Sequence, residues 1–308
     1  MRNHFAQELT RSASQKSEIF LVYGDIGNKL FDSYKEHHPG RFVNAGIAEA
    51  SMISMAAGMA RYGLVPVVYT INPFIYLKAL EQIKLDVCYP NLPVIMVGTG
   101  GALAYSELGT THHSLEDIGV LSNLPNLRIY VPADEQELSM CFAEALTEGT
   151  PAYIRIGKKE VEKVHDAQPN FQSTNHGLIP IRVSNNSEIL LVSYGTISTE
   201  VFHAWQVLRK DTEIDFWTLP RLKPNEISEI TKLITTYRVI VAVEEHRSTG
   251  GMTALLLEAA SLSGAPRPEL VFINSGDKFH TGLGNQNQAR KSLGLDSDSI
   301  VRKVRSLV

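Results

Sequence analysis

Short apolar runs alternate with longer amphipathic segments along the first half of the chain. The run Leu92–Val97 is almost entirely apolar, as in central strands of a parallel sheet covered on both faces. The segments between such runs follow helical periodicity, and this alternation predicts a parallel sheet with helices packed on it. The predicted strands are Ile19–Gly24, Arg41–Ala45, Pro66–Thr70, Pro93–Thr99, Leu127–Pro132 and Ala152–Ile156, and the predicted helices are Lys29–His37, Ala48–Tyr62, Phe74–Val87 and Glu135–Glu148.

A second alternating series follows a polar, irregular stretch from about Lys158 to Asn186. Such a composition is typical of a linker between two cores. We therefore predict an α/β fold with two doubly wound domains at residues 1–160 and 187–308, joined by a linker at residues 161–186. The second series has strands at Glu188–Tyr194, Glu213–Leu219, Val239–Glu244 and Glu269–Ile273 and helices at Thr199–Arg209, Asn225–Thr235, Gly251–Ser263, Gln286–Leu293 and Ser297–Leu307.

The composition favours small-molecule chemistry. The 308 residues are 44% hydrophobic, which is enough for two cores. The formal net charge of -4 comes from 29 basic and 33 acidic residues that are interspersed, so we expect no nucleic-acid partner. The start of the chain lacks a signal-peptide core and no later run reaches membrane-spanning length, so we expect a cytoplasmic protein without membrane contact. We expect Cys88 and Cys141 to be buried thiols.

Several common catalytic signatures are absent from the sequence. The first predicted strand is not followed by G-x-G-x-x-G, and the chain has no P-loop, no G-x-S-x-G and no His/Cys cluster at zinc spacing. The chain alone therefore does not predict a nicotinamide, ATP or zinc enzyme. The loops after strand ends remain as candidate sites, because ligands bind there in open α/β sheets.

The stretch Phe42–Ala50 places one carboxyl group where a strand turns into a helix. Gly46 supplies the conformational freedom for the turn, and a largely apolar helix continues from Ala50. Glu49 is therefore our candidate for the chemistry. The alternative is a glutamate in a first helical turn, where the helix macrodipole favours a negative charge.

A long, glycine-rich loop follows the fourth predicted strand and ends in two histidines. It runs from Gly98 to Asp117, and it contains His112 and His113. A histidine here is a candidate acid, base or hydrogen-bond partner for a substrate, because imidazole titrates near neutral pH. The alternative is a mobile surface loop with solvated histidines.

Three aromatic side chains surround the Asn72-Pro73 junction of a strand and a helix. Tyr69, Phe74 and Tyr76 are candidates for a wall that stacks on a heteroaromatic ring. The alternative is that they are ordinary core aromatics, because aromatic side chains usually serve packing.

Over nearly its whole length the chain resembles the C-terminal two-thirds of transketolase and of 1-deoxy-D-xylulose-5-phosphate synthase. It is most similar to the smaller subunit of a split transketolase. The order and spacing of the motifs carry the resemblance, rather than any one of them. They are Asn44-Ala45-Gly46-Ile47-Ala48-Glu49, Ala79-Leu80-Glu81-Gln82-Ile83, Gly109-Thr110-Thr111-His112, Tyr130-Val131-Pro132-Ala133-Asp134-Glu135, Pro151-Ala152-Tyr153-Ile154-Arg155, Val243-Glu244-Glu245-His246, Gly250-Gly251 and Ala289-Arg290-Lys291-Ser292-Leu293-Gly294-Leu295.

The resemblance implies a cofactor, thiamine diphosphate, and a role for Glu49 in its activation. In the family the glutamate of G-I-x-E donates a hydrogen bond to the aminopyrimidine ring and favours its imino form. Ile47 of the same motif is assigned to the cofactor as well. Phe74 is the nearest match to the phenylalanine that stacks on the pyrimidine, and Tyr76 is its rival because the register is open by one or two residues.

The resemblance also implies a substrate half of the site, and there this sequence departs from the family. His112 matches a histidine that contacts the substrate, and Lys158 stands where the family has an arginine that binds the substrate's phosphate. The family's Asp before the Gly of D-G-x-T-H is Leu108 here, and its upstream basic residue is Gly100 or Gly101. These changes remove polar contacts to a sugar phosphate, so an unusual sugar is an expected acceptor.

The resemblance further implies a partner. The chain lacks the G-D-G run and downstream Asn of a diphosphate-binding domain. The diphosphate and its Mg (or Ca) are then held mainly by a separately encoded subunit, in an α2β2 assembly with the active site at the interface. The implied activity is transfer of a two-carbon ketol unit between sugars or sugar phosphates.

Two other functions stay open at this stage. One is the beta subunit of a 2-oxo acid dehydrogenase, which shares the two-domain layout. The helix signature around Glu49 and the Gly294-Leu295 region favour the transketolase interpretation. The other is a non-catalytic regulatory subunit that has kept the fold, which the missing Asp favours and which Glu49 and His112 disfavour.

Overall fold

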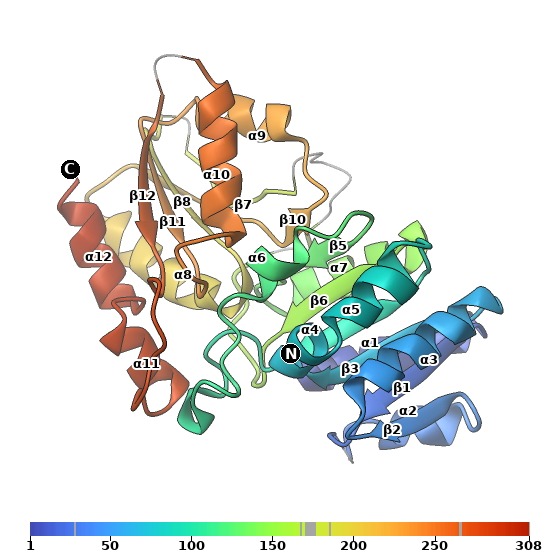
Figure 1. Cartoon of the computed structure of the whole chain (residues 1–308). Helices are drawn as coiled ribbons and strands as arrows, with labels where there is room; N and C mark the ends of the chain where they lie inside the picture. Colours follow the sequence, from blue (N-terminus) through green and yellow to red (C-terminus); the bar gives the residue numbers. More distant parts are fainter. Residues whose placement is uncertain (28, 167, 170–176, 185, 265–266, 308) are drawn as a thin grey trace.

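Two sheets with helices on both faces form the protein, as the hydrophobic pattern predicts (Figure 1). The computed structural model describes residues 1–27, 29–166, 168–169, 177–184, 186–264 and 267–307. Part of the predicted linker, at residues 167, 170–176 and 185, lies outside them. The α/β fold class is confirmed.

The first sheet has seven strands in the order β10-β5-β6-β4-β3-β1-β2. Six of these strands are parallel, and β10, which comes from the second half of the chain, pairs antiparallel with β5 at the edge. The strands are β1 (Ile19–Gly24), β2 (Phe42–Gly46), β3 (Val65–Ile71), β4 (Ile95–Thr99), β5 (Arg128–Tyr130), β6 (Ala152–Ile156) and β10 (Arg221–Lys223).

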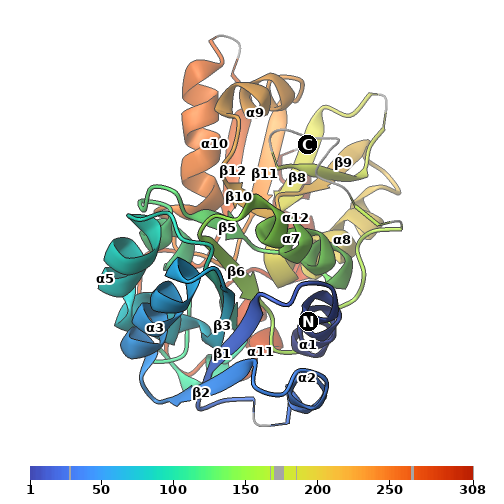
Figure 2. The same ribbon diagram turned by 90° about the vertical axis from the view of Figure 1, so that its right-hand side faces the viewer.

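Helices cover both faces of this sheet. Figure 2 shows α1 and α2 on one side and α3 and α5 on the other. Apolar side chains of α1, α2 and α7 enter one core cluster, and those of α3, α4 and α6 enter another. The helices are α1 (Arg2–Gln15), α2 (Asp32–His37), α3 (Glu49–Arg61), α4 (Asn72–Lys78), α5 (Leu80–Gln82), α6 (Asp117–Leu121) and α7 (Glu135–Glu148), with a π-helical turn η1 at Ile83–Cys88 and a 3-10 turn η2 at Ser106–Leu108.

The second sheet has five strands in the order β12-β11-β8-β9-β7, and only β7 at its edge is antiparallel. Its strands are β7 (Ile179–Arg182), β8 (Ile189–Ser193), β9 (Ile214–Thr218), β11 (Val239–Val243) and β12 (Glu269–Ile273). Its helices are α8 (Ser198–Leu208), α9 (Ile227–Ile234), α10 (Gly251–Leu262), α11 (Gln286–Ser292) and α12 (Ser297–Arg305), with a 3-10 turn η4 at Gly195–Ile197.

Several elements differ from the sequence prediction, among them the short helix α6, which was not predicted. The helix α1 was not predicted; it packs Phe5 and Leu9, one turn apart, under the first sheet. The strand β7 lies inside the predicted linker, and β10 is only three residues long. The single helix expected over Phe74–Val87 is broken at Ala79, which has φ -126°, so α4 ends at Lys78.

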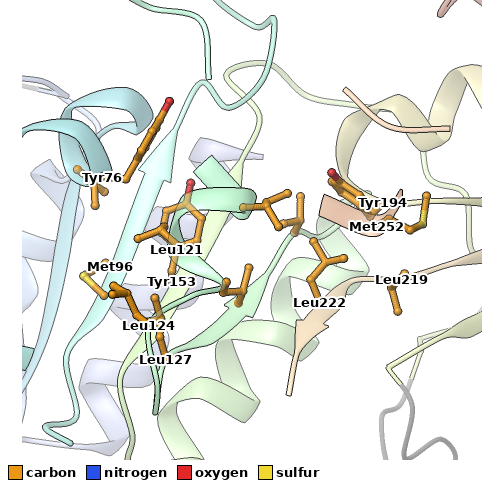
Figure 3. Packing of buried hydrophobic residues seen from close by; sticks show 14 of the residues in the cluster. Tyr76, Met96, Leu121, Leu124, Leu127, Tyr153, Tyr194, Leu219, Leu222 and Met252 are labelled. Atoms are coloured by element: carbon orange, nitrogen blue, oxygen red, sulfur yellow. The ribbon is translucent and has the colours of Figure 1, made fainter. Parts of the chain in front are cut away.

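One apolar cluster runs through both halves of the molecule (Figure 3). Leu121 and Leu124 of the first half belong to the same cluster as Leu219, Leu222 and Met252 of the second. A shared core fixes the loops of one domain against those of the other. The loop that carries His112 is also hydrogen-bonded to the second domain, through Ser106 and Gly284.

The structure also bears on the two cysteines and on membrane-spanning segments. Cys88 and Cys141 are both buried, as predicted. In the part of the chain that the structure describes, no helix combines the length and the apolar composition that crossing a bilayer requires.

Candidate active site

Glu49 is the first residue of α3, directly after the turn that leaves β2. Gly46 has φ +69°, a conformation that favours glycine, and its N–H donates to the Asn44 side chain at 2.8 Å. The residue Glu49 is only 6% exposed. Its Oε2 accepts a hydrogen bond from Lys78 Nζ at 3.1 Å. The turn therefore delivers a nearly buried carboxyl group to the edge of the sheet, where its hydrogen-bond partner is a half-exposed lysine.

The three aromatic candidates around Asn72-Pro73 differ in their burial and contacts. Phe74 is half-buried on α4, and Lys78 Nζ lies 4.4 Å from its ring centroid. Tyr76 has no exposed surface and belongs to the core (Figure 3). Tyr69 is also buried, and its ring stacks on Phe5 at 5.7 Å. Of the three, Phe74 shares a contact with Glu49, because Lys78 Nζ touches both residues.

His112 lies against Phe74. The two ring centroids are 5.4 Å apart in an edge-to-face arrangement. The backbone N–H of His112 donates to the Gly109 carbonyl at 3.0 Å, and Gly109 has φ +76°. Partial burial lowers the pKa of His112 below its usual value, so the neutral imidazole predominates near pH 7.

The loop that carries His112 is tied down at several points. His113 is buried, and its Nε2 lies 3.2 Å from the Ser106 carbonyl oxygen. Ser106 Oγ donates to the Gly284 carbonyl at 2.5 Å, which joins the loop to the second domain. Ala102 and Ser114 pair as an isolated β-bridge. This ordering favours a functional loop over a mobile surface segment.

Tyr105 belongs to the same loop and lies between His112 and Lys158. Its ring contacts His112 at 5.9 Å, and Lys158 Nζ lies 4.5 Å from its centroid. Gly100 has φ +74°, and a Cβ atom on it would overlap the Tyr105 ring. A Cβ atom on Gly101 would likewise overlap the Arg155 side chain. The positions where the family has a basic residue are therefore covered by neighbouring side chains.

The outer end of this region is open. Leu108, which stands where the family has an aspartate, is 55% exposed. Lys158 also lines a cavity of about 460 Å³ between the domains, together with Thr196 and Asn285. A cavity of that size accommodates a small polar ligand. The structure therefore offers room for a small polar ligand beside Lys158, whereas His112 is not among the residues that line this cavity.

The predicted site residues fall into one continuous set of contacts, apart from two. Ile47 is 78% exposed on the surface just before Glu49, and Tyr76 is in the core. Sequence reasoning missed two members of the set, Lys78 and Tyr105. The contacts run in the order Glu49, Lys78, Phe74, His112, Tyr105 and Lys158.

A buried network behind the site fixes the elements that carry it. The Asp117 carboxylate, with no exposed surface, accepts from Asn72 Nδ2 at 2.9 Å, Tyr153 OH at 2.6 Å and Arg155 Nη1 at 3.0 Å. Burial alone would raise the pKa of Asp117, but Arg155 and the hydrogen bonds outweigh it and hold the pKa below its usual value. Asn72 begins α4, so this network positions the helix of Phe74.

The polar side chains of the Val243-Glu244-Glu245-His246 motif have hydrogen-bond partners within the protein. Glu244 accepts from Tyr194 OH at 2.7 Å and from the Met252 N–H at 2.9 Å. Glu245 accepts two hydrogen bonds from Arg290. His246 Nε2 accepts from the Gly119 N–H at 3.2 Å, which links the two domains. This arrangement indicates a structural role for the motif.

The residues present fit the aminopyrimidine half of thiamine diphosphate. Lys78 Nζ simultaneously reaches the Glu49 carboxylate and the face of Phe74, so one ligand ring can reach both groups. A carboxyl for a ring nitrogen and an aromatic face for stacking are the contacts that such a ring needs. Among the described residues, no group of three or more His, Cys, Asp or Glu is placed to hold a metal ion.

The fold and the site define a two-domain α/β protein whose first domain carries the candidate site. The chain belongs to the transketolase family. Residues 1–163 match the transketolase pyrimidine binding domain, and residues 179–300 match the transketolase C-terminal domain.

Known proteins resemble the chain over nearly its full length. It is 33% identical to an apulose-4-phosphate transketolase subunit of Actinobacillus succinogenes, covering 87% of this chain and 85% of that protein. It is 28% identical to the protein of the same description from Phocaeicola vulgatus, covering 98% and 95%. A solved structure described as a split gene transketolase, inactive beta4 tetramer, has a TM-score of 0.85 at 23% identity, covering 99% and 96%. The predicted resemblance to a split transketolase is confirmed.

Proposed function

We propose that this chain is the catalytic, pyrimidine-binding subunit of a thiamine-diphosphate-dependent transketolase. It transfers a two-carbon ketol unit between sugars or sugar phosphates in the cytoplasm, together with a separately encoded subunit. The observation that carries the proposal is the nearly buried Glu49 carboxyl at the start of α3, beside the half-buried ring of Phe74. The relatives that are themselves named as transketolase subunits support the partner.

Thiamine diphosphate, when bound, supplies the nucleophilic carbon for breaking a carbon–carbon bond of a ketose. Glu49 holds a proton at its carboxyl and shares it with the pyrimidine edge, and Phe74 supports the face of the ring. His112, neutral near pH 7, accepts a hydrogen bond from a substrate hydroxyl. Lys158 binds a phosphate group as a point charge.

The partner subunit holds the diphosphate and the Mg (or Ca), and the two kinds of chain assemble as α2β2. Ile47, exposed beside Glu49, lies on the surface that this subunit and the cofactor cover. Burying an exposed isoleucine at such an interface is favourable.

The substrate is an unusual sugar or sugar phosphate. Leu108 and the two glycines at positions 100 and 101 leave this chain without polar groups that the family uses there. One relative is named an apulose-4-phosphate transketolase subunit, and another, at 25% identity, a 6-deoxy-6-sulfo-D-fructose transketolase subunit from Clostridium sp.. Their names indicate that members of this family act on sugars with different end groups.

The substitution Glu49→Gln in the assembled complex tests the proposal. The partner is first obtained by pull-down with this chain, and ketol transfer is measured with thiamine diphosphate and Mg²⁺ present. We expect a loss of activity of about 100-fold or more, because an amide cannot share the proton. Circular dichroism and thermal unfolding should stay unchanged.

Glu229→Gln is the matched control, because Glu229 is on the surface of α9 and pairs with Lys232 there. Unchanged activity of Glu49→Gln would support the regulatory subunit instead. A chain that recovers no partner and no cofactor binding would overturn the proposal altogether.

A further inference from the structure

Lys78 makes both of the contacts that the pyrimidine ring needs. Its Nζ lies 3.1 Å from Glu49 Oε2 and 4.4 Å from the Phe74 ring centroid. Phe74 and Lys78 are four residues apart on α4, so they share one face of the helix. A single ammonium group thus bridges the two proposed cofactor contacts.

The end of helix α4 places the Lys78 side chain beside Glu49. α4 ends at Lys78, and the helical path breaks at Ala79 with φ -126° and ψ 20°. A cation at the last turn of a helix interacts favourably with the helix macrodipole. The side chain is 46% exposed, whereas that of Glu49 is 7% exposed. The Lys78 ammonium group can therefore turn into the surrounding water, whereas the Glu49 carboxyl is enclosed by the protein.

We infer that Lys78 is a positioning residue that holds the Glu49 carboxyl in place and yields it when the pyrimidine ring binds. This inference rests on the proposed function. The ring and the lysine compete for the same carboxylate oxygen and the same aromatic face. Cofactor binding therefore includes the free energy of breaking the Lys78 contacts.

The exposure of Lys78 sets how strongly its contacts weaken cofactor binding. Lys78 is half-exposed, so solvent screens its ion pair with Glu49 and weakens it. Removing the competitor should therefore tighten cofactor binding by about twofold to fivefold. The effect should fade with salt, because screening weakens an exposed pair in the wild-type protein.

Titration of thiamine diphosphate into the assembled complex at saturating Mg²⁺ tests the inference, with near-ultraviolet circular dichroism as the readout. Lys78→Met keeps the length of the side chain and removes its charge. We expect its dissociation constant for the cofactor to be about twofold to fivefold lower than that of the wild type at low salt. The difference should disappear at about 0.5 M salt. Lys78→Arg should bind like the wild type.

Lys232→Met is the matched control, because this lysine also pairs with a glutamate but is 72% exposed in the second domain. Equal or weaker cofactor binding by Lys78→Met would overturn the inference. So would an effect confined to the KM of a phosphorylated sugar, which would assign Lys78 to the substrate. If Glu49→Gln weakens cofactor binding and Lys78→Met does not tighten it, only the inference fails. If the wild-type complex binds no cofactor, the proposed function fails.

Discussion

Two buried carboxyl groups of the first domain differ in what surrounds them. Asp117 has no exposed surface, and its hydrogen-bond partners Asn72, Tyr153 and Arg155 are themselves buried. Glu49 is almost as buried, but its partner Lys78 is half-exposed and can leave. The first carboxyl is satisfied by the fold, whereas the second depends on a contact that a ligand can replace. Burial alone therefore does not distinguish a structural carboxylate from the one that we propose to act in catalysis.

The adjacent histidines repeat the contrast. His113 is buried and hydrogen bonds to the backbone of its own loop. His112 is partly exposed and lies against two aromatic rings that line the candidate site. In both pairs, buried groups of the fold hold one member, and the other member contacts an exposed side chain, Lys78 for Glu49 and Thr111 for His112 Nδ1 at 2.9 Å. Substitutions should therefore damage folding in one case and activity in the other.

Asp117→Asn should produce the largest effect on stability. The amide leaves the Arg155 guanidinium buried without its counter-ion, which typically costs about 3–5 kcal/mol. Urea unfolding should show this loss, while Glu49→Gln should change stability by less than about 1 kcal/mol. Similar stabilities of the two variants would contradict the distinction between them.

The same network predicts a pH dependence. The pKa of Asp117 is lowered in the folded protein, so its contribution to stability is fully present above its unfolded pKa of about 3.9. That contribution is lost as the pH falls through the lower folded pKa. Between the folded and the unfolded pKa of Asp117, a fall in pH should lower the free energy of unfolding of Asp117→Asn less steeply than that of the wild type.

His112→Asn should reduce kcat/KM about 10-fold to 100-fold, because it removes a hydrogen-bond partner of the substrate. Burial lowers the pKa of His112, so the wild type should keep its activity to a lower pH than a histidine of ordinary pKa would allow and lose it as the ring protonates. The variant should lack this acid limb. His203→Asn, on the surface of α8, is the control. An acid limb that persists in His112→Asn would assign the titration to another group.

The sequence predicted the parallel strands and the Glu49 turn because both depend on local pattern. A nearly continuous apolar run defines β4, and Gly46 marks the turn before α3. Lys78 could not be predicted, because its place depends on the break at Ala79. The strand β10 escaped prediction as well, since three residues of the second domain complete the first sheet.

Tyr105→Ala should produce the smallest effect and test the substrate half of the site. The ring lies between His112 and Lys158, and only a glycine at position 100 leaves room for it. A partly exposed cation over an aromatic ring, such as Lys158, contributes about 0.5–1 kcal/mol, so we expect the KM for a phosphorylated sugar to rise about twofold to fivefold with kcat nearly unchanged. Tyr105→Phe keeps the ring and should behave like the wild type. A fall in kcat with constant KM would instead place Tyr105 with His112 among the groups that act in the transition state.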